Sequence, residues 1–270
     1  SMNPSHRSPT RAFTFCFLGI LSLILNLACP SVRSLAEAQT KSVVLSVEDG
    51  ASPWSQSDGS GYANDLVVAA YRAVGVDVDL KVVPYARCKR MAINGEVAGC
   101  FSTSPSPDFK GLIELSDRPL FSVTSGYFYN VNNPPSVSRQ ESLPAETIVG
   151  TVIGYEYPAS FEQLRMQKKL MVEESPSEDV NLRKLAAGRI NLALLNYNEM
   201  KSPESLMRRA GVLGQVKTGF EAGSMNSYIA FSTKHPDGAW AREQFNKGFT
   251  IITANGTLHR IKKAWMRLVN

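Results

Sequence analysis

The stretch "VDLKVVPYARCKRMAINGEVAGCFST" (Val78–Thr103) changes its hydrophobic pattern twice. It begins with a β-branched run that ends at Pro84 and continues with apolar residues at helical spacing as far as Asn94-Gly95. It ends in a second apolar run, Val97–Thr103. Strands that alternate with helices in this way form parallel sheets covered on both faces. We therefore predict a strand, a helix and a second strand here.

The same alternation extends outward on both sides. Before this stretch we predict a strand at Ser42–Val47, a turn-rich loop at Glu48–Gly61 and a helix at Tyr62–Val76; after it, a long strand at Leu120–Val131. A Pro/Ser/Asn-rich linker follows at 132–144. Beyond the linker we predict strands at 147–154, 170–174, 190–196 and 227–233 and helices at 159–170, 177–188, 197–211 and 239–268, the last divided at Asn255-Gly256. The chain therefore contains two α/β series.

The N-terminal 38 residues have the layout of a secretory signal peptide. Arg7 and Arg11 precede an apolar stretch, Ala12–Ala28, and small-residue cleavage sites follow at Ser34–Ala38. We expect export, with a mature chain that begins between Glu37 and Lys41. A membrane anchor is the alternative, and a lipid anchor at Cys29 is disfavoured because Asn26 stands where an apolar residue is expected.

Composition excludes several classes of function. The formal net charge of the 270 residues is +5. The predicted signal peptide contains Arg7, Arg11, Arg33 and Glu37, so it contributes +2 of this charge. The remaining +3 is too small to indicate nucleic-acid binding. Two cysteines and two histidines remain after the leader, without metal-ligand spacing, so we predict no metal site and no cofactor. We find no hydrolase motif.

Polar loops follow four of the predicted strands. They come after Val47, Phe101, Gly154 and Asn196. In open parallel sheets, ligands bind beyond the carboxyl ends of the strands. We expect these loops to face one another across a cleft.

The order of motifs resembles that of the extracytoplasmic solute-binding proteins, family 3, which have the type II periplasmic binding fold. The resemblance spans about residues 42–268 and rests on "SVEDGASPW", "GYANDL", "PYARC…NGEVAG", "ELSDRPLF", "VGTVIG", "AAGRINLALLN", "IAFSTKHPD" and "GFTIITANGTLHRIKKAW". The "PYARC" motif is similar to a branch with a Pro-aromatic-x-Arg-Cys helix start. The resemblance implies two lobes, at 39–130 plus 226–270 and at 131–225, each a mainly parallel sheet flanked by helices, with two crossover strands as the hinge. It also implies a periplasmic monomer that binds a small polar solute for an ABC permease or a membrane sensor.

The sequence departs from the family's amino-acid binders at two positions. Those proteins hold the ligand carboxylate with an arginine after the third strand and the ammonium with a lobe-two aspartate. Here Phe109 or Lys110 takes the place of the arginine, and Asn196 takes the place of the aspartate. Since a guanidinium fork matches a carboxylate best, we predict a ligand other than a standard α-amino acid.

The candidate ligand contacts come from the polar loops. Trp54 and Tyr85 offer stacking surfaces or seal the first lobe. Arg87 is a replacement carboxylate grip or a salt-bridge partner of Asp65. Lys110 is a weaker candidate because an ammonium matches a carboxylate less specifically.

Hydroxyl and carboxylate groups complete the set of candidates. We expect Ser102, Thr103 and Ser104 to hold one end of the ligand through hydroxyl and N–H groups. Glu48 either binds a ligand cation or caps its loop. The second lobe adds Tyr155, Asn196 and Glu199.

Two alternatives to solute binding remain. Some family members resemble cyclohexadienyl dehydratases, in which Glu48, Glu156 or Glu199 would supply the catalytic acid; the other alternative is a degenerate receptor for a protein partner. In this fold Cys88 and Cys100 would lie on a packed helix and strand, so in an oxidising compartment a disulfide is expected, with two buried thiols as the alternative.

Overall fold

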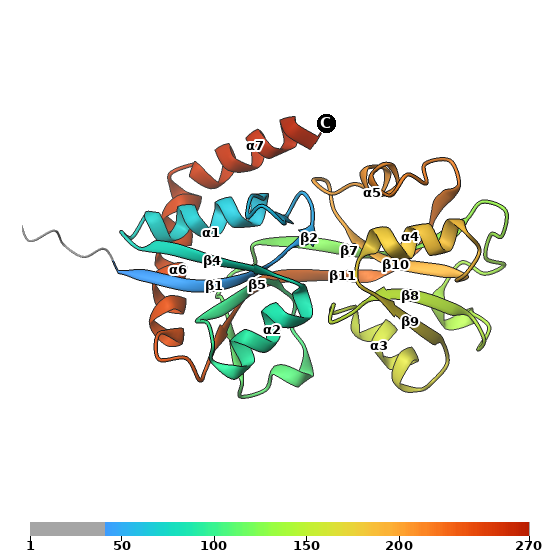
Figure 1. Cartoon of the computed structure of the whole chain (residues 1–270), viewed down its shortest axis with the longest axis horizontal. Coiled ribbons are helices and arrows are strands. Elements are labelled where there is room, and N and C mark those ends of the chain that lie inside the picture. The colour runs from blue at the N-terminus through green and yellow to red at the C-terminus, as the bar shows by residue number, and fades with distance from the viewer. Residues whose placement is uncertain (1–40, 270) are drawn as a thin grey trace, which may run out of the picture. The chain divides into compact units, whose positions relative to one another are not determined.

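Each predicted α/β series forms a sheet in the computed structural model, which describes residues 41–269. The expected signal peptide and Cys29 lie outside the described residues. The two sheets are flanked by helices and joined through shared strands (Figure 1). The predicted two-lobed α/β fold is therefore confirmed.

The sheet of the first lobe is built around its first strand. β1 (Ser42–Glu48) lies parallel to β4 (Asp77–Val83) on one side and to β5 (Gly99–Thr103) on the other. Successive side chains of β1 point to opposite faces of the sheet, so that Val43, Leu45 and Val47 lie together in the core. The short β6 (Ile113–Leu115) completes the sheet.

Four helices cover the first lobe. α1 (Tyr62–Arg72) packs on α6 (Gly238–Ala254) and α7 (Thr257–Val269), and α2 (Tyr85–Asn94) packs on β1 and β5. α2 ends at Gly95, whose left-handed φ of 78° is accessible to glycine without strain. The disulfide between Cys88 of α2 and Cys100 of β5, with Cα atoms 5.6 Å apart, joins this helix to the sheet.

The second lobe repeats the arrangement. β8 (Ile148–Val152) lies parallel to β9 (Met171–Ser175) and β10 (Leu192–Tyr197). Its helices are α3 (Ala159–Met166), α4 (Glu178–Ala186) and α5 (Pro203–Ala210). Buried Leu182, Leu185 and Leu195 form the core between α4, α5 and the sheet.

Two long antiparallel strands connect the lobes. β7 (Phe121–Asn130) pairs with β10, and β11 (Val216–Ser232) pairs with β7 and then with β5 and β6. We predicted only the end of β11, at 227–233, because its first half has no run of apolar residues. That half is a strand because β7 supplies its hydrogen-bond partners.

Two local predictions were incomplete. Residues 197–211 are mostly helical as predicted, but Tyr197 ends β10, the Asn198 side chain closes a turn, and the helix begins only at Pro203 with Ser202 as its cap. The loop at 48–61 contains a small hairpin, β2 (Gly50–Ala51) with β3 (Ser55–Gln56). Single 3₁₀ turns lie at Pro107–Phe109 and Gln140–Ser142. Within residues 41–269, none of the helices has the length and apolar character needed to span a membrane.

Candidate functional site

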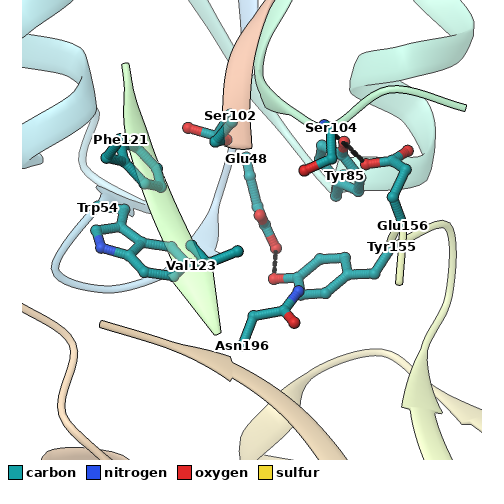
Figure 2. Close-up of a pocket in the computed structure, with 11 residues that line it drawn as sticks. Glu48, Trp54, Tyr85, Ser102, Ser104, Phe121, Val123, Tyr155, Glu156 and Asn196 are labelled. Carbon is teal, nitrogen blue, oxygen red and sulfur yellow. Dashed lines mark hydrogen bonds between the residues drawn. The ribbon is translucent and has the colours of Figure 1, made fainter. Parts of the chain in front are cut away.

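A small cavity lies where the carboxyl ends of strands from both lobes meet (Figure 2). Its volume is about 30 Å³, which is room for about two water molecules. Seven candidates from the sequence line it together: Glu48, Trp54, Tyr85, Ser102, Ser104, Tyr155 and Asn196. The expected edge-of-sheet location thus holds a cavity shared by the two lobes.

Glu48, the last residue of β1, stands in the middle of the cavity (Figure 2). It is 7% exposed, and its carboxylate accepts a hydrogen bond from the Tyr155 hydroxyl of the other lobe. Burial raises the pKa of Glu48 from its usual 4.5 to about 7. The Tyr155 hydrogen bond and the Lys201 charge oppose this increase in pKa, whereas Glu178 and Asp49 add to it.

Glu156 crosses between the lobes as well. Its carboxylate accepts hydrogen bonds from the Tyr85 hydroxyl at 2.6 Å and the Ser104 backbone N–H at 3.3 Å, and it pairs with the Lys89 ammonium at 2.5 Å. Burial and then the Glu156 charge raise the pKa of Tyr85 well above 10, so the phenol remains a donor. The serine-rich turn therefore holds a carboxylate of the protein itself.

Trp54 forms one wall of the cavity with strand β7. Its ring centroid lies 4.8 Å from that of Phe121, and its Nε1 donates to Asn198 Oδ1 of the second lobe at 3.3 Å. The Lys201 ammonium lies 4.2 Å from the Trp54 ring centroid and pairs with the buried Glu178. Stacked aromatic rings and a cation on a ring face are both favourable in a desolvated site.

Asn196 and Ser102 complete the polar lining. The Ser125 hydroxyl donates to Asn196 Oδ1 at 2.5 Å, and the Asn196 backbone N–H donates to Glu178 Oε1 at 2.9 Å. Ser102 has a left-handed φ of 64°, and its buried Oγ has no hydrogen-bond partner among the described residues.

Four candidates lie away from this lining. Thr103 is buried, and its hydroxyl donates to the Cys100 carbonyl at 3.4 Å. Arg87 faces solvent because α2 buries the face that carries Tyr85, Cys88 and Ala92.

The other two lie farther along the chain. Lys110 is exposed because its neighbour Phe109 turns inward, 7% exposed, with the Lys89 ammonium 5.6 Å from its ring centroid. Glu199 pairs with Lys262 and lines a separate cavity of about 510 Å³.

Sequence reasoning missed part of the lining. Phe121, Val123 and Ser227 come from the crossover strands, and Glu156 was predicted as a helix cap or a catalytic acid but not as a ligand contact. No local signal marked the strand residues, whereas the Tyr-Glu-Tyr triplet at 155–157 after a strand could have marked Glu156.

Burial of charge shapes the acid–base behaviour of the site. Since the pKa of Glu48 is higher in the folded protein, its contribution to stability is greatest below about pH 4.5 and is lost as the pH rises to about 7. We expect the unfolding free energy of Glu48→Gln, measured by urea denaturation, to lack this decline. Profiles of equal slope in the two proteins between pH 5 and pH 7 would contradict the prediction.

Comparison with known proteins gives similarity at the level of structure. No family model matches the chain, and no curated protein matches it. A histidine kinase sensor domain with similarity to periplasmic binding proteins has a TM-score of 0.70 and 18% identity, covering 83% of this chain and 95% of its own. An ancestral arginine-binding protein bound to arginine has a TM-score of 0.68 and 18% identity, and the match covers 83% of this chain and 97% of that protein.

A third structure bears on the enzymatic alternative. It is an ancestral amino acid-binding protein, a precursor of cyclohexadienyl dehydratase, with a TM-score of 0.65 and 14% identity, covering 83% of this chain and 95% of its own. At such identities the similarity establishes the fold. The chain has the two-lobed α/β fold of periplasmic binding proteins.

Proposed function

We propose that this protein is an exported solute-binding protein of the family 3 type, which captures a small polar molecule between its lobes. The observation that carries the proposal is the cavity, lined from both lobes by carboxylate, hydroxyl, amide and aromatic groups. Ligand sites combine apolar walls with a few polar groups in this way. The captured solute would be delivered to an ABC importer or reported to a membrane sensor, and we expect a monomer.

Hinge closure is the proposed mechanism. Residues 39–130 with 226–270 would move as one half and 131–225 as the other, about β7 and β11. In this structure three side-chain hydrogen bonds join the lobes across the cleft: Tyr155 to Glu48, Tyr85 to Glu156, and Trp54 to Asn198. Because a cavity of about 30 Å³ is too small for most solutes, we expect the lobes to separate to admit one.

The lining argues against α-amino acids as ligands. The donors that would hold a carboxylate, namely the Ser104 N–H, the Tyr85 hydroxyl and the Lys89 ammonium, already bind Glu156. Asn196 is neutral, so a ligand ammonium placed there lacks a charge-assisted hydrogen bond worth about 1.5–3 kcal/mol.

A dehydratase is the second candidate because of one observation. A buried carboxyl with a pKa of about 7 can act as a general acid near neutral pH, and Glu48 is such a group. A prephenate-like substrate would need cations for its carboxylates, and the described cavity lining contains no lysine, arginine or histidine. We therefore favour binding over catalysis.

A thermal-shift screen of the purified protein tests the proposal. We expect a solute among amines, polyols, dicarboxylates and aromatic acids to raise the melting temperature by mass action, whereas the twenty amino acids leave it unchanged. X-ray scattering should report a change in the separation of the lobes with the same solute. Turnover of prephenate would favour the dehydratase, and submicromolar binding of an amino acid would contradict the exclusion of amino acids.

A further inference from the structure

The charged groups around the cavity do not balance. Lys89 pairs with Glu156, and Lys201 pairs with Glu178. Glu48 is the carboxylate left over: its hydrogen-bond partner is the neutral Tyr155 hydroxyl, and no basic side chain forms an ion pair with it among the described residues. A buried anion without a counter-charge is costly, and a bound cation would remove that cost.

The described cavity lining contains no basic side chain that could pair with an anion. Its ionisable side chains are two glutamates and two tyrosines. The Tyr85 hydroxyl, the Lys89 ammonium and the Ser104 backbone N–H already bind Glu156. An anionic solute would therefore meet the Glu48 carboxylate without a basic side chain in the described lining to offset the repulsion.

A second polar group in the cavity is unsatisfied. Ser102 lines the cavity, and its Oγ is buried without a hydrogen-bond partner among the described residues. Its backbone φ of 64° is left-handed, which is unfavourable for a residue with a Cβ atom, so the surrounding fold maintains this backbone conformation. A hydroxyl oxygen and a carboxylate are both acceptors for the N–H groups of an ammonium.

Aromatic rings surround these acceptors. Trp54 and Phe121 lie on one side of Glu48 and Tyr155 on the other (Figure 2). The Trp54 ring already carries one ammonium, that of Lys201, at 4.2 Å from its centroid. Ring faces attract cations, most strongly where water is excluded.

We propose that the solute is a small primary amine whose ammonium group donates to the Glu48 carboxylate and the Ser102 hydroxyl, with its carbon chain against Trp54 and Phe121. The inference rests on the proposed function and names its ligand class. The present cavity of about 30 Å³ has room for the ammonium head, so accommodating the carbon chain requires the lobes to move apart. A quaternary ammonium has the same charge but no N–H to donate.

Calorimetry with four probes of similar size tests the ligand class. The probes are propylamine, tetramethylammonium, propanol and propionate, in phosphate buffer because Tris is itself a primary amine. At about pH 8, where Glu48 is ionised, we expect propylamine to bind at least about tenfold more tightly than the other three. The affinity for propylamine should rise between about pH 6 and pH 8 as Glu48 loses its proton, with Tyr155, Lys201, Glu178 and Asp49 as the neighbouring groups that influence the titration.

Variants locate the site. Glu48→Gln should weaken propylamine binding by about tenfold or more and remove its pH dependence, because a charge-assisted hydrogen bond is lost. Ser102→Ala should weaken binding by a few-fold, as expected for loss of one neutral hydrogen bond. The matched control is Glu96→Gln, an exposed acid outside the cavity lining, which should leave binding unchanged. If Glu48→Gln does not fold, the effect of Ser102→Ala on propylamine binding and the pH dependence of that binding in the unaltered protein test the proposal.

The outcomes separate this inference from the proposed function. Binding of propionate or propanol without propylamine overturns the amine assignment and leaves solute binding standing. Propylamine binding that is insensitive to Glu48→Gln also overturns it. If none of the four probes binds at about 10 mM, the amine assignment fails, and the wider thermal-shift screen then decides whether the protein binds any solute.

Discussion

Lys201→Ala is expected to lower the free energy of unfolding by about 3–5 kcal/mol, because it leaves the Glu178 carboxylate buried without its cation. The Lys201 and Glu178 side chains are 0% and 2% exposed. The lysine also lies over the Trp54 ring, so its removal leaves a gap beneath the wall of the cavity. Urea denaturation monitored by circular dichroism measures the change.

Two further variants show that the effect comes from the buried charge. Lys247→Ala removes an exposed i,i+4 partner of Glu243 and should change stability by less than about 0.5 kcal/mol. Lys201→Met combined with Glu178→Gln removes both charges and preserves an acceptor for the Asn196 N–H, so it should recover much of the loss. A cost for Lys201→Ala no larger than that for Lys247→Ala would contradict the prediction.

Removal of the Cys88–Cys100 disulfide is the second large expected effect. The cysteines are 12 residues apart, and closing a loop of this length stabilises a protein by about 3 kcal/mol through the entropy of the unfolded chain. We expect the double variant Cys88→Ala, Cys100→Ala to be less stable by about that amount. Denaturation with and without a reducing agent provides the measurement.

Reduction supplies the internal control for that variant. The double variant should be insensitive to the reducing agent, and the reduced unaltered protein should approach it in stability. Because the bridge ties α2 to β5, which carry Tyr85 and Ser102, we also expect weaker ligand binding after reduction. Two free thiols in mass spectrometry of the non-reduced protein would show that the bridge does not form.

The location of the site is more predictable from sequence than its contacts. Polar residues directly after strands, such as Glu48 and Asn196, do line the cavity because the carboxyl ends of the strands meet at one edge. The choice between neighbours was not predictable. Phe109 turns inward and Lys110 outward, and a shift of one residue in the preceding turn reverses this.

The alternation of strands and helices, and through it the two α/β lobes, can be predicted from the residues alone, because periodicities of 2 and 3.6 residues are local properties of the chain. Which charges meet depends instead on long-range packing. Glu156 binds Tyr85 and Lys89 across the cleft, and Glu48 binds Tyr155, which lies 107 residues away in the sequence. Such contacts depend on how the two lobes face each other, and no local pattern of residues encodes that relation. The same lobe-to-lobe packing leaves Glu48 without an ion-pair partner among residues 41–269, the feature on which the ligand assignment depends.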